Sequence, residues 1–220
     1  MSGPSPASSS QAALHALTRQ AEGLWQAVYP LWPDFSVEVL PSIDSTNTAL
    51  MQRARAGDRA PTLLVALEQS AGRGRRGKSW HSQPGASLTF SLGLPYQPAD
   101  WSGLSLAVGV SLAESLHPEI RLKWPNDLWW RGRKLGGILI EAATLGAQRY
   151  AVIGVGLNVE LPELPAWSPV PLDEAATQAL PPVPPAALCE LDPGRDAGQW
   201  LAALVPALVQ DLQAFERAGF

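Results

Sequence analysis

The sequence has little of what several common protein classes require. Cys189 is the single cysteine among 220 residues, which excludes a disulfide framework and a cysteine-based metal site. Charged residues make up only 16%, and the net charge of −4 argues against nucleic acid as the main partner, because phosphate binding requires a basic face. No apolar run approaches the roughly 20 residues that cross a bilayer, and the first residues lack the basic and apolar parts of a signal peptide. We therefore expect a cytoplasmic protein with no membrane or nucleic-acid partner.

The chain has enough apolar material for one large domain, since hydrophobic residues make up 46% of it. Residues 1–12 begin with serine, proline and small side chains, and are expected to be a disordered tail. Residues 13–220 are then the domain itself. Within it, eight prolines lie between Pro162 and Pro185, so residues 160–195 are predicted to form an irregular excursion or a mobile cover.

Hydrophobic periodicity predicts a mixture of helices and strands. Helical spacing runs from Ala13 to Val28, and residues 44–47 offer capping side chains for a second helix that ends at Gly57. Two more helices are predicted at 104–116 and 200–215. Strands are predicted at 35–43, 62–67, 88–94, 120–124, 134–143 and 148–159, with the last two forming a hairpin around Gly146. This order indicates an α+β (mixed α/β) fold.

The segment from Gly72 to Ser79, G-R-G-R-R-G-K-S, matches two phosphate-binding patterns at once, those of P-loops and of dinucleotide folds. Both patterns require a helix to begin inside the motif, because the helix N-terminus holds the phosphate. Pro84 and Gly85 follow closely and oppose such a helix. What remains is a glycine-rich loop with four cations in six residues, which is either a solvated basic surface or a clamp for a phosphorylated ligand.

Four blocks in this order resemble the biotin–protein ligases. The first is Ser45-Thr46-Asn47, and the second runs from Gln69 through the glycine–arginine loop to Trp80. The third joins Lys123-Trp124-Pro125-Asn126-Asp127 to the run from Arg133 to Ile138, and the fourth is Gly154-Val155-Gly156-Leu157-Asn158. The match spans about residues 36–160, and it implies a central mixed sheet flanked by helices, as in the catalytic domain of class II aminoacyl-tRNA synthetases.

The resemblance implies a reaction in two steps. Biotin and ATP, with Mg²⁺, first give biotinyl-5′-AMP and pyrophosphate. A lysine of a biotin carboxyl carrier protein, such as the carrier of acetyl-CoA carboxylase, then takes the biotinyl group and releases AMP. Both steps place negative charge on phosphate oxygens, so fixed cations and backbone donors are the expected means of stabilisation.

The same resemblance assigns roles to individual residues. Arg75 and Lys134 are the expected catalytic residues, and Asp127 is the expected Mg²⁺ ligand. Biotin is expected to contact Ser45, Thr46, Asn47, Gln69, Arg73, Gly74, Arg75, Lys134, Gly137, Gly154 and Gly156. The nucleotide is expected to contact Arg75, Lys78, Trp80, Asn126, Asp127 and Asn158. Lys78 stands where many relatives have arginine, and it keeps the charge without the bidentate fork.

Several of these residues also have purely local explanations. The hydroxyl and amide groups of 45–47 are good helix N-caps, and asparagine and aspartate at 126 and 127 suit a turn after proline. Trp80 could be a core side chain, and glycines inside strands also mark close sheet packing. Lys134 is the strongest single indication, because it enters an otherwise apolar run.

Other functions remain open at this point. A lipoate or octanoate ligase of the related fold is the nearest alternative, followed by a P-loop NTPase and a nucleotide-binding module without catalysis. Some relatives carry an N-terminal DNA-binding domain and many end in an SH3-like barrel, and we expect neither in this chain. The resemblance also leaves a homodimer open.

Overall fold

The computed structural model describes residues 6–161 and 184–220. Along these two stretches, three helices are interspersed with the first three strands, four strands then follow one another, and the fourth helix comes last. Short 3₁₀ helices lie at Arg75–Gly77 and Leu188–Glu190. The helices are α1 (Pro6–Val28), α2 (Thr46–Arg55), α3 (Leu104–Leu116) and α4 (Ala197–Ala218). The strands are β1 (Ser36–Leu40), β2 (Thr62–Ala66), β3 (Ser87–Pro95), β4 (Arg121–Lys123), β5 (Asp127–Trp130), β6 (Arg133–Leu145) and β7 (Gln148–Asn158).

The described strands form one sheet of seven in the order β1-β2-β3-β7-β6-β5-β4. β1 and β2 run parallel, and every other neighbouring pair is antiparallel. The predicted mixed sheet in an α+β fold is therefore confirmed. The predicted hairpin is also present, because β6 and β7 pair from Leu145↔Gln148 onward and Gly146 takes the positive φ of 68° that the turn needs.

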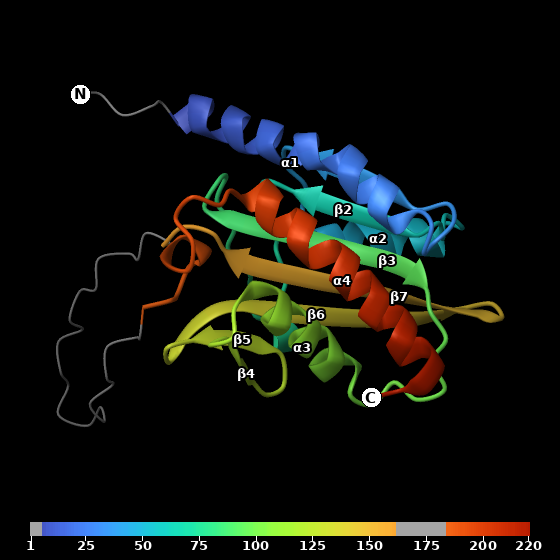
Figure 1. The fold of residues 1–220 in the computed structure, drawn as a ribbon. Helices are drawn as coiled ribbons and strands as arrows, with labels where there is room; N and C mark the ends of the chain where they lie inside the picture. Colours follow the sequence, from blue (N-terminus) through green and yellow to red (C-terminus); the bar gives the residue numbers. More distant parts are fainter. Residues whose placement is uncertain (1–5, 162–183) are drawn as a thin grey trace, which may run out of the picture.

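The two faces of the sheet are covered unequally (Figure 1). Helices α1, α3 and α4 pack over one face, and α2 lies on the other. Successive side chains of β7 point alternately to these two faces of the sheet. Ala151, Ile153, Val155 and Leu157 belong to the large core, whereas Tyr150 and Val152 pack with α2. Past Val152, Gly154 and Gly156 of β7 bring no side chain of their own to the α2 face.

Several boundaries differ from the sequence-based expectation. Helix α1 begins at Pro6, so residues 6–12 of the expected tail are helical; proline is well suited to the first turn of a helix, where its missing N–H is not needed. Residues 1–5 lie outside the described residues, as do residues 162–183 of the proline-rich segment. Ser45 caps α2 as predicted, its side chain accepting from Thr48 N at 3.4 Å.

Two strand predictions need correction. β3 was expected to be half-buried, but Ser87 to Leu94 are all buried, because α2 and the residues around it cover the polar side as well. β5 was not predicted, since residues 126–127 were interpreted as a turn. Its hairpin to β6 uses Arg131 and Gly132 with φ of 47° and 75°, a two-residue turn of the kind that asparagine and glycine usually make. None of the helices in the described part of the chain has the length and apolar character that a bilayer crossing demands.

Candidate active site

A pocket of about 370 Å³ opens on the sheet face that α2 leaves uncovered. This volume is in the range of small-ligand sites. Every site residue predicted from the sequence lines it except Asn158. They are Ser45, Thr46, Asn47, Gln69, Arg73, Gly74, Arg75, Lys78, Trp80, Asn126, Asp127, Lys134, Gly137, Gly154 and Gly156.

The floor of the pocket is backbone, because the strands that form it carry glycine there. Gly137 of β6 pairs with Gly156 of β7, and Leu139 pairs with Gly154. A Cβ atom on Gly154 would run into the amide of Asn47, and one on Gly156 would run into the indole ring of Trp80. Glycine is therefore required at both positions, because Asn47 and Trp80 lie directly over them. Both of these side chains also line the pocket.

The glycine–arginine loop closes on itself before it reaches β3. Gly74 N donates to Lys78 O at 2.7 Å, and Trp80 N donates to Gly72 O at 2.9 Å. Gly72 has no room for a side chain, because an added Cβ atom would collide with the carbonyl oxygen of Trp80. Between these bonds lies a single 3₁₀ turn, and no helix is assigned between it and β3. The P-loop and dinucleotide interpretations, which both require a helix here, are thus excluded by the structure.

The cations of this loop differ in their partners. Arg73 Nη1 lies 3.0 Å from Glu141 Oε1 and donates to Glu141 Oε2 at 3.2 Å. Among the described residues, no carboxylate pairs with Arg75, Arg76 or Lys78, and all three line the pocket. An anionic ligand would therefore meet three cations whose charges are not already neutralised by an ion pair.

A connected polar cluster forms the wall next to α2. Gln69 Oε1 accepts from Thr46 N at 2.7 Å and from Thr46 Oγ1 at 3.1 Å, which leaves the Nε2 donor of Gln69 for a ligand. Thr46 Oγ1 and Ser91 Oγ are 2.7 Å apart, and Ser91 donates to Asn47 Oδ1 at 2.6 Å. Asn47 Nδ2 in turn donates to Leu139 O and Glu141 Oε2. The cluster is therefore held in one arrangement before any ligand binds.

Lys134 and Asp127 face each other across the end of the floor. Lys134 Nζ lies 2.8 Å from Asp127 Oδ1, and the two side chains are 44% and 25% exposed. Asn126 Nδ2 donates to Ile138 O at 2.8 Å, which fixes the turn between β4 and β5. The amide oxygen of Asn126 and the carboxylate of Asp127 are oxygen donors of the kind that Mg²⁺ prefers. Within the described residues, no group of three or more histidine, cysteine, aspartate or glutamate side chains is gathered at one point.

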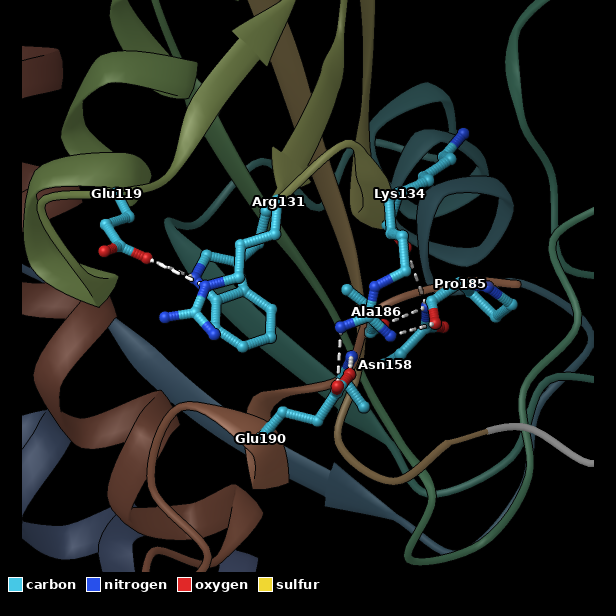
Figure 2. A network of polar contacts seen from close by, with 10 residues as sticks. Glu119, Arg131, Lys134, Asn158, Pro185, Ala186 and Glu190 are labelled. Atoms are coloured by element: carbon cyan, nitrogen blue, oxygen red, sulfur yellow. Dashed lines mark hydrogen bonds and ion pairs between the residues drawn. The ribbon is translucent and has the colours of Figure 1, made fainter. Parts of the chain in front are cut away.

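Asn158 lies beside the pocket and not in its lining. Its Nδ2 donates to Ala186 O at 2.9 Å and approaches Lys134 O at 3.5 Å (Figure 2). The residue thus connects the end of β7 to the chain that returns after residue 183. Nearby, Arg133 Nη2 lies 2.6 Å from Glu190 Oε2, and this hydrogen bond lowers the pKa of the Glu190 carboxyl.

Two functional candidates were missed in the sequence. Ser91 is fully buried at the centre of the polar cluster, and Glu141 pairs with both Arg73 and Asn47. For both residues, the sequence contains a pattern that could have identified them. Serine and threonine repeat at 87, 89 and 91 on one side of a strand, and Glu141 is the single charge between Leu135 and Leu145.

Together, the fold and the pocket define an α+β domain with a cavity of small-ligand size beside a cationic loop. Comparison with known proteins assigns the chain to a family. Residues 39–158 match the model of the biotin/lipoate A/B protein ligase family. The chain therefore belongs to that family, and its fold is that of the class II synthetase-like catalytic domain.

Individual relatives agree with this assignment. The bifunctional ligase/repressor BirA of Escherichia coli is 44% identical over 136 residues, which are 57% of this chain and 41% of that protein. The biotin–[acetyl-CoA-carboxylase] ligase of Mycobacterium tuberculosis is 39% identical over 157 residues, 66% of this chain and 54% of that protein. The chain thus spans about half the length of these curated relatives. Among solved structures, the biotin protein ligase of Aquifex aeolicus in complex with biotin and ATP superposes with a TM-score of 0.63 at 28% identity, covering 83% of this chain and 72% of that one.

Proposed function

We propose that this protein is an ATP-dependent biotin–protein ligase. The observation that carries the proposal is the convergence of four separate segments on one pocket. These segments bring a hydroxyl and amide cluster, a backbone floor, a cationic loop and Lys134 to the same cavity. Relatives named as biotin ligases, and a solved relative that holds biotin and ATP, support the choice of substrates.

The first step would join biotin to AMP. A biotin carboxylate oxygen attacks the α-phosphorus of ATP, the bond to the bridging oxygen breaks, and pyrophosphate leaves. The ureido ring of biotin has one carbonyl and two N–H groups, which suits the Gln69 amide and the hydroxyls of Ser45 and Thr46. Asn47 has its amide engaged by Ser91, Leu139 and Glu141, so its part is to hold this wall in place.

Fixed cations would stabilise the charge that develops on the phosphate oxygens. Lys134, at the end of the floor, would contact the biotin carboxylate and the α-phosphate, while Arg75 and Lys78 of the loop would contact the nucleotide. Trp80 supplies an aromatic wall for the adenine. Mg²⁺ would be held by Asp127 and Asn126 together with phosphate oxygens, and it would neutralise part of the triphosphate charge. Asn158 is proposed to act at the edge of the nucleotide site.

The second step would transfer the biotinyl group to a protein. A carrier lysine amine attacks the acyl carbon, the bond to the AMP oxygen breaks, and the amine loses a proton. The carrier is proposed to be a biotin carboxyl carrier protein, as the names of the acetyl-CoA-carboxylase ligases suggest. We place the reaction in the cytoplasm, without nucleic acid or membrane as a partner, and sedimentation measurements would decide whether the protein is a homodimer.

The decisive test is biotin-dependent exchange of pyrophosphate into ATP with the purified chain. We expect exchange that requires biotin and Mg²⁺ and that lipoate does not support. Absence of exchange with biotin would exclude the proposal. Equal exchange with lipoate and biotin would move the protein to the lipoate branch of the same family.

A further inference from the structure

Lys134 sits at an irregularity of the sheet. β5 and β6 pair as Trp129↔Lys134 and then as Leu128↔Gly136, so Leu135 is an extra residue on β6. Such a bulge re-aims the side chains beside it and breaks the regular ladder of backbone hydrogen bonds. The direction of the Lys134 side chain therefore depends on whatever holds the bulged backbone.

The chain at 184–190 provides that support. Ala186 N donates to Lys134 O at 2.8 Å, a bond from outside the β5–β6 ladder. Ala186 and Ala187 are fully buried, so this segment is packed into the body of the protein. Figure 2 shows the Lys134 side chain pointing away from these contacts, while its main chain takes part in them.

A partly buried ion pair connects this segment to the residue before Lys134. Arg133 Nη2 lies 2.6 Å from Glu190 Oε2, and both side chains are only 24% exposed. Glu190 Oε1 also accepts from Ala187 N at 3.0 Å, and Arg133 Nη1 approaches Pro185 O at 3.4 Å. One guanidinium and one carboxylate thus tie both neighbours of Ala186 to the start of β6.

We propose that Arg133 and Glu190 are positioning residues for Lys134. Neither lines the pocket, so they act through the backbone. Their ion pair holds residues 184–190 against β6. The hydrogen bond from Ala186 N then fixes the backbone at the bulge, and the bulge sets the direction of the Lys134 side chain. The proposal rests on the proposed function, since it concerns the rate of the step that Lys134 promotes. Misplacing a catalytic group by about 1 Å is enough to slow a reaction strongly.

The experiment uses the full chain and measures kcat and KM separately for biotin-dependent pyrophosphate exchange. Glu190→Gln retains an oxygen for Ala187 N and removes the charge, and Arg133→Met removes the cation at similar length. We expect both to lower kcat about tenfold while the KM values for biotin and ATP change less than about twofold. Arg133→Lys, which keeps a charge within reach of Glu190, should recover part of the loss.

The matched control is a second ion pair, between Arg131 in the turn of the β5–β6 hairpin and Glu119 before β4. Arg131 Nε lies 3.2 Å from Glu119 Oε2, with side chains 64% and 50% exposed, and no hydrogen bond or ion pair joins either residue to the described residues 184–190 (Figure 2). Glu119→Gln should leave kcat and both KM values unchanged. A kcat for Glu190→Gln within about twofold of wild type would overturn the proposal. So would a loss in Glu190→Gln that the Glu119→Gln control reproduces.

Amide hydrogen exchange separates this proposal from the function on which it rests. Glu190→Gln should speed exchange at the amides of Ala186 and Ala187, and Glu119→Gln should not. If wild type shows no pyrophosphate exchange, the proposed function fails. If wild type is active and Glu190→Gln leaves both amides as protected as before, the ion pair does not hold the segment and the positioning role is wrong.

Discussion

Lys134 Nζ and Asp127 Oδ1 form a 2.8 Å ion pair inside the pocket, between two strands that are neighbours in the sheet. Each group is already the counter-ion of the other before any ligand is present. The Lys134 ammonium has three N–H donors, so an anion that enters the pocket can share this lysine with Asp127.

Replacing Lys134 tests its part in the chemistry. Lys134→Ala should leave biotin binding measurable, because the polar cluster next to α2, which is proposed to bind the ureido ring, lies elsewhere in the pocket. The substitution should slow adenylate formation by about a hundredfold or more. Isothermal titration with biotin and single-turnover formation of the adenylate would separate the two effects. A variant that forms adenylate at the wild-type rate would show that Lys134 is not catalytic.

Ser91 should matter for stability as well as for biotin binding. Ser91→Ala leaves Asn47 Oδ1 without its donor and Thr46 without its neighbour, so we expect a loss of about 1–3 kcal/mol in the free energy of unfolding. The control is Ser111→Ala, because Ser111 Oγ is equally buried and has no hydrogen-bond partner among the described residues. Urea unfolding of both variants should show a clear loss for Ser91 alone; equal effects would contradict the network.

The pocket floor gives a prediction about glycine. Gly154→Ala forces its new methyl group against the Asn47 amide, so it should destabilise the fold by about 1–3 kcal/mol and weaken biotin binding. Gly23→Ala is the matched change, since nothing lies within 4 Å of its added carbon and it stands inside α1. That control should be stabilising by about 0.5–1 kcal/mol. Thermal unfolding and biotin titration of the two proteins would settle the comparison, and tight biotin binding by Gly154→Ala would refute the role of the floor.

Acid should weaken the contact between Glu190 and Arg133. The hydrogen bond from Arg133 lowers the pKa of Glu190 in the folded state, so this carboxylate stabilises the fold fully above the ordinary glutamate pKa of about 4.3. The contribution is lost as the pH falls through the lowered folded value. The difference in unfolding free energy between wild type and Glu190→Gln should thus be largest near pH 7 and shrink below about pH 4. A difference that is constant across this range would contradict the assignment.

Local sequence signals were sufficient for much of the fold. Helix α3 runs from Leu104 to Leu116 as predicted, because its apolar residues are bounded by a proline that ends it. The hairpin at Gly146 and the cap at Ser45 were equally local. β5 was missed because it has only four residues after a proline, and its turn uses arginine where asparagine is usual.

The candidate site was predictable as a set of residues and not as a network. The resemblance to biotin–protein ligases predicted that Lys134 and the glycine–arginine loop share one site, and in the structure both line the same pocket. It could not reveal that Glu141 pairs with Arg73, because the two are 68 positions apart in the sequence and meet only when β6 enters the sheet. For the same reason, the contact of Ala186 with Lys134 lies beyond any local pattern.

The glycine floor has a consequence for anyone who would redesign this protein. Side chains can change rotamer to admit a larger molecule, but a surface made of main chain in the middle of a sheet cannot. Altered ligand preference must therefore come from substitutions in the walls, at residues such as Trp80 and Gln69. The main-chain floor keeps its shape in every such variant.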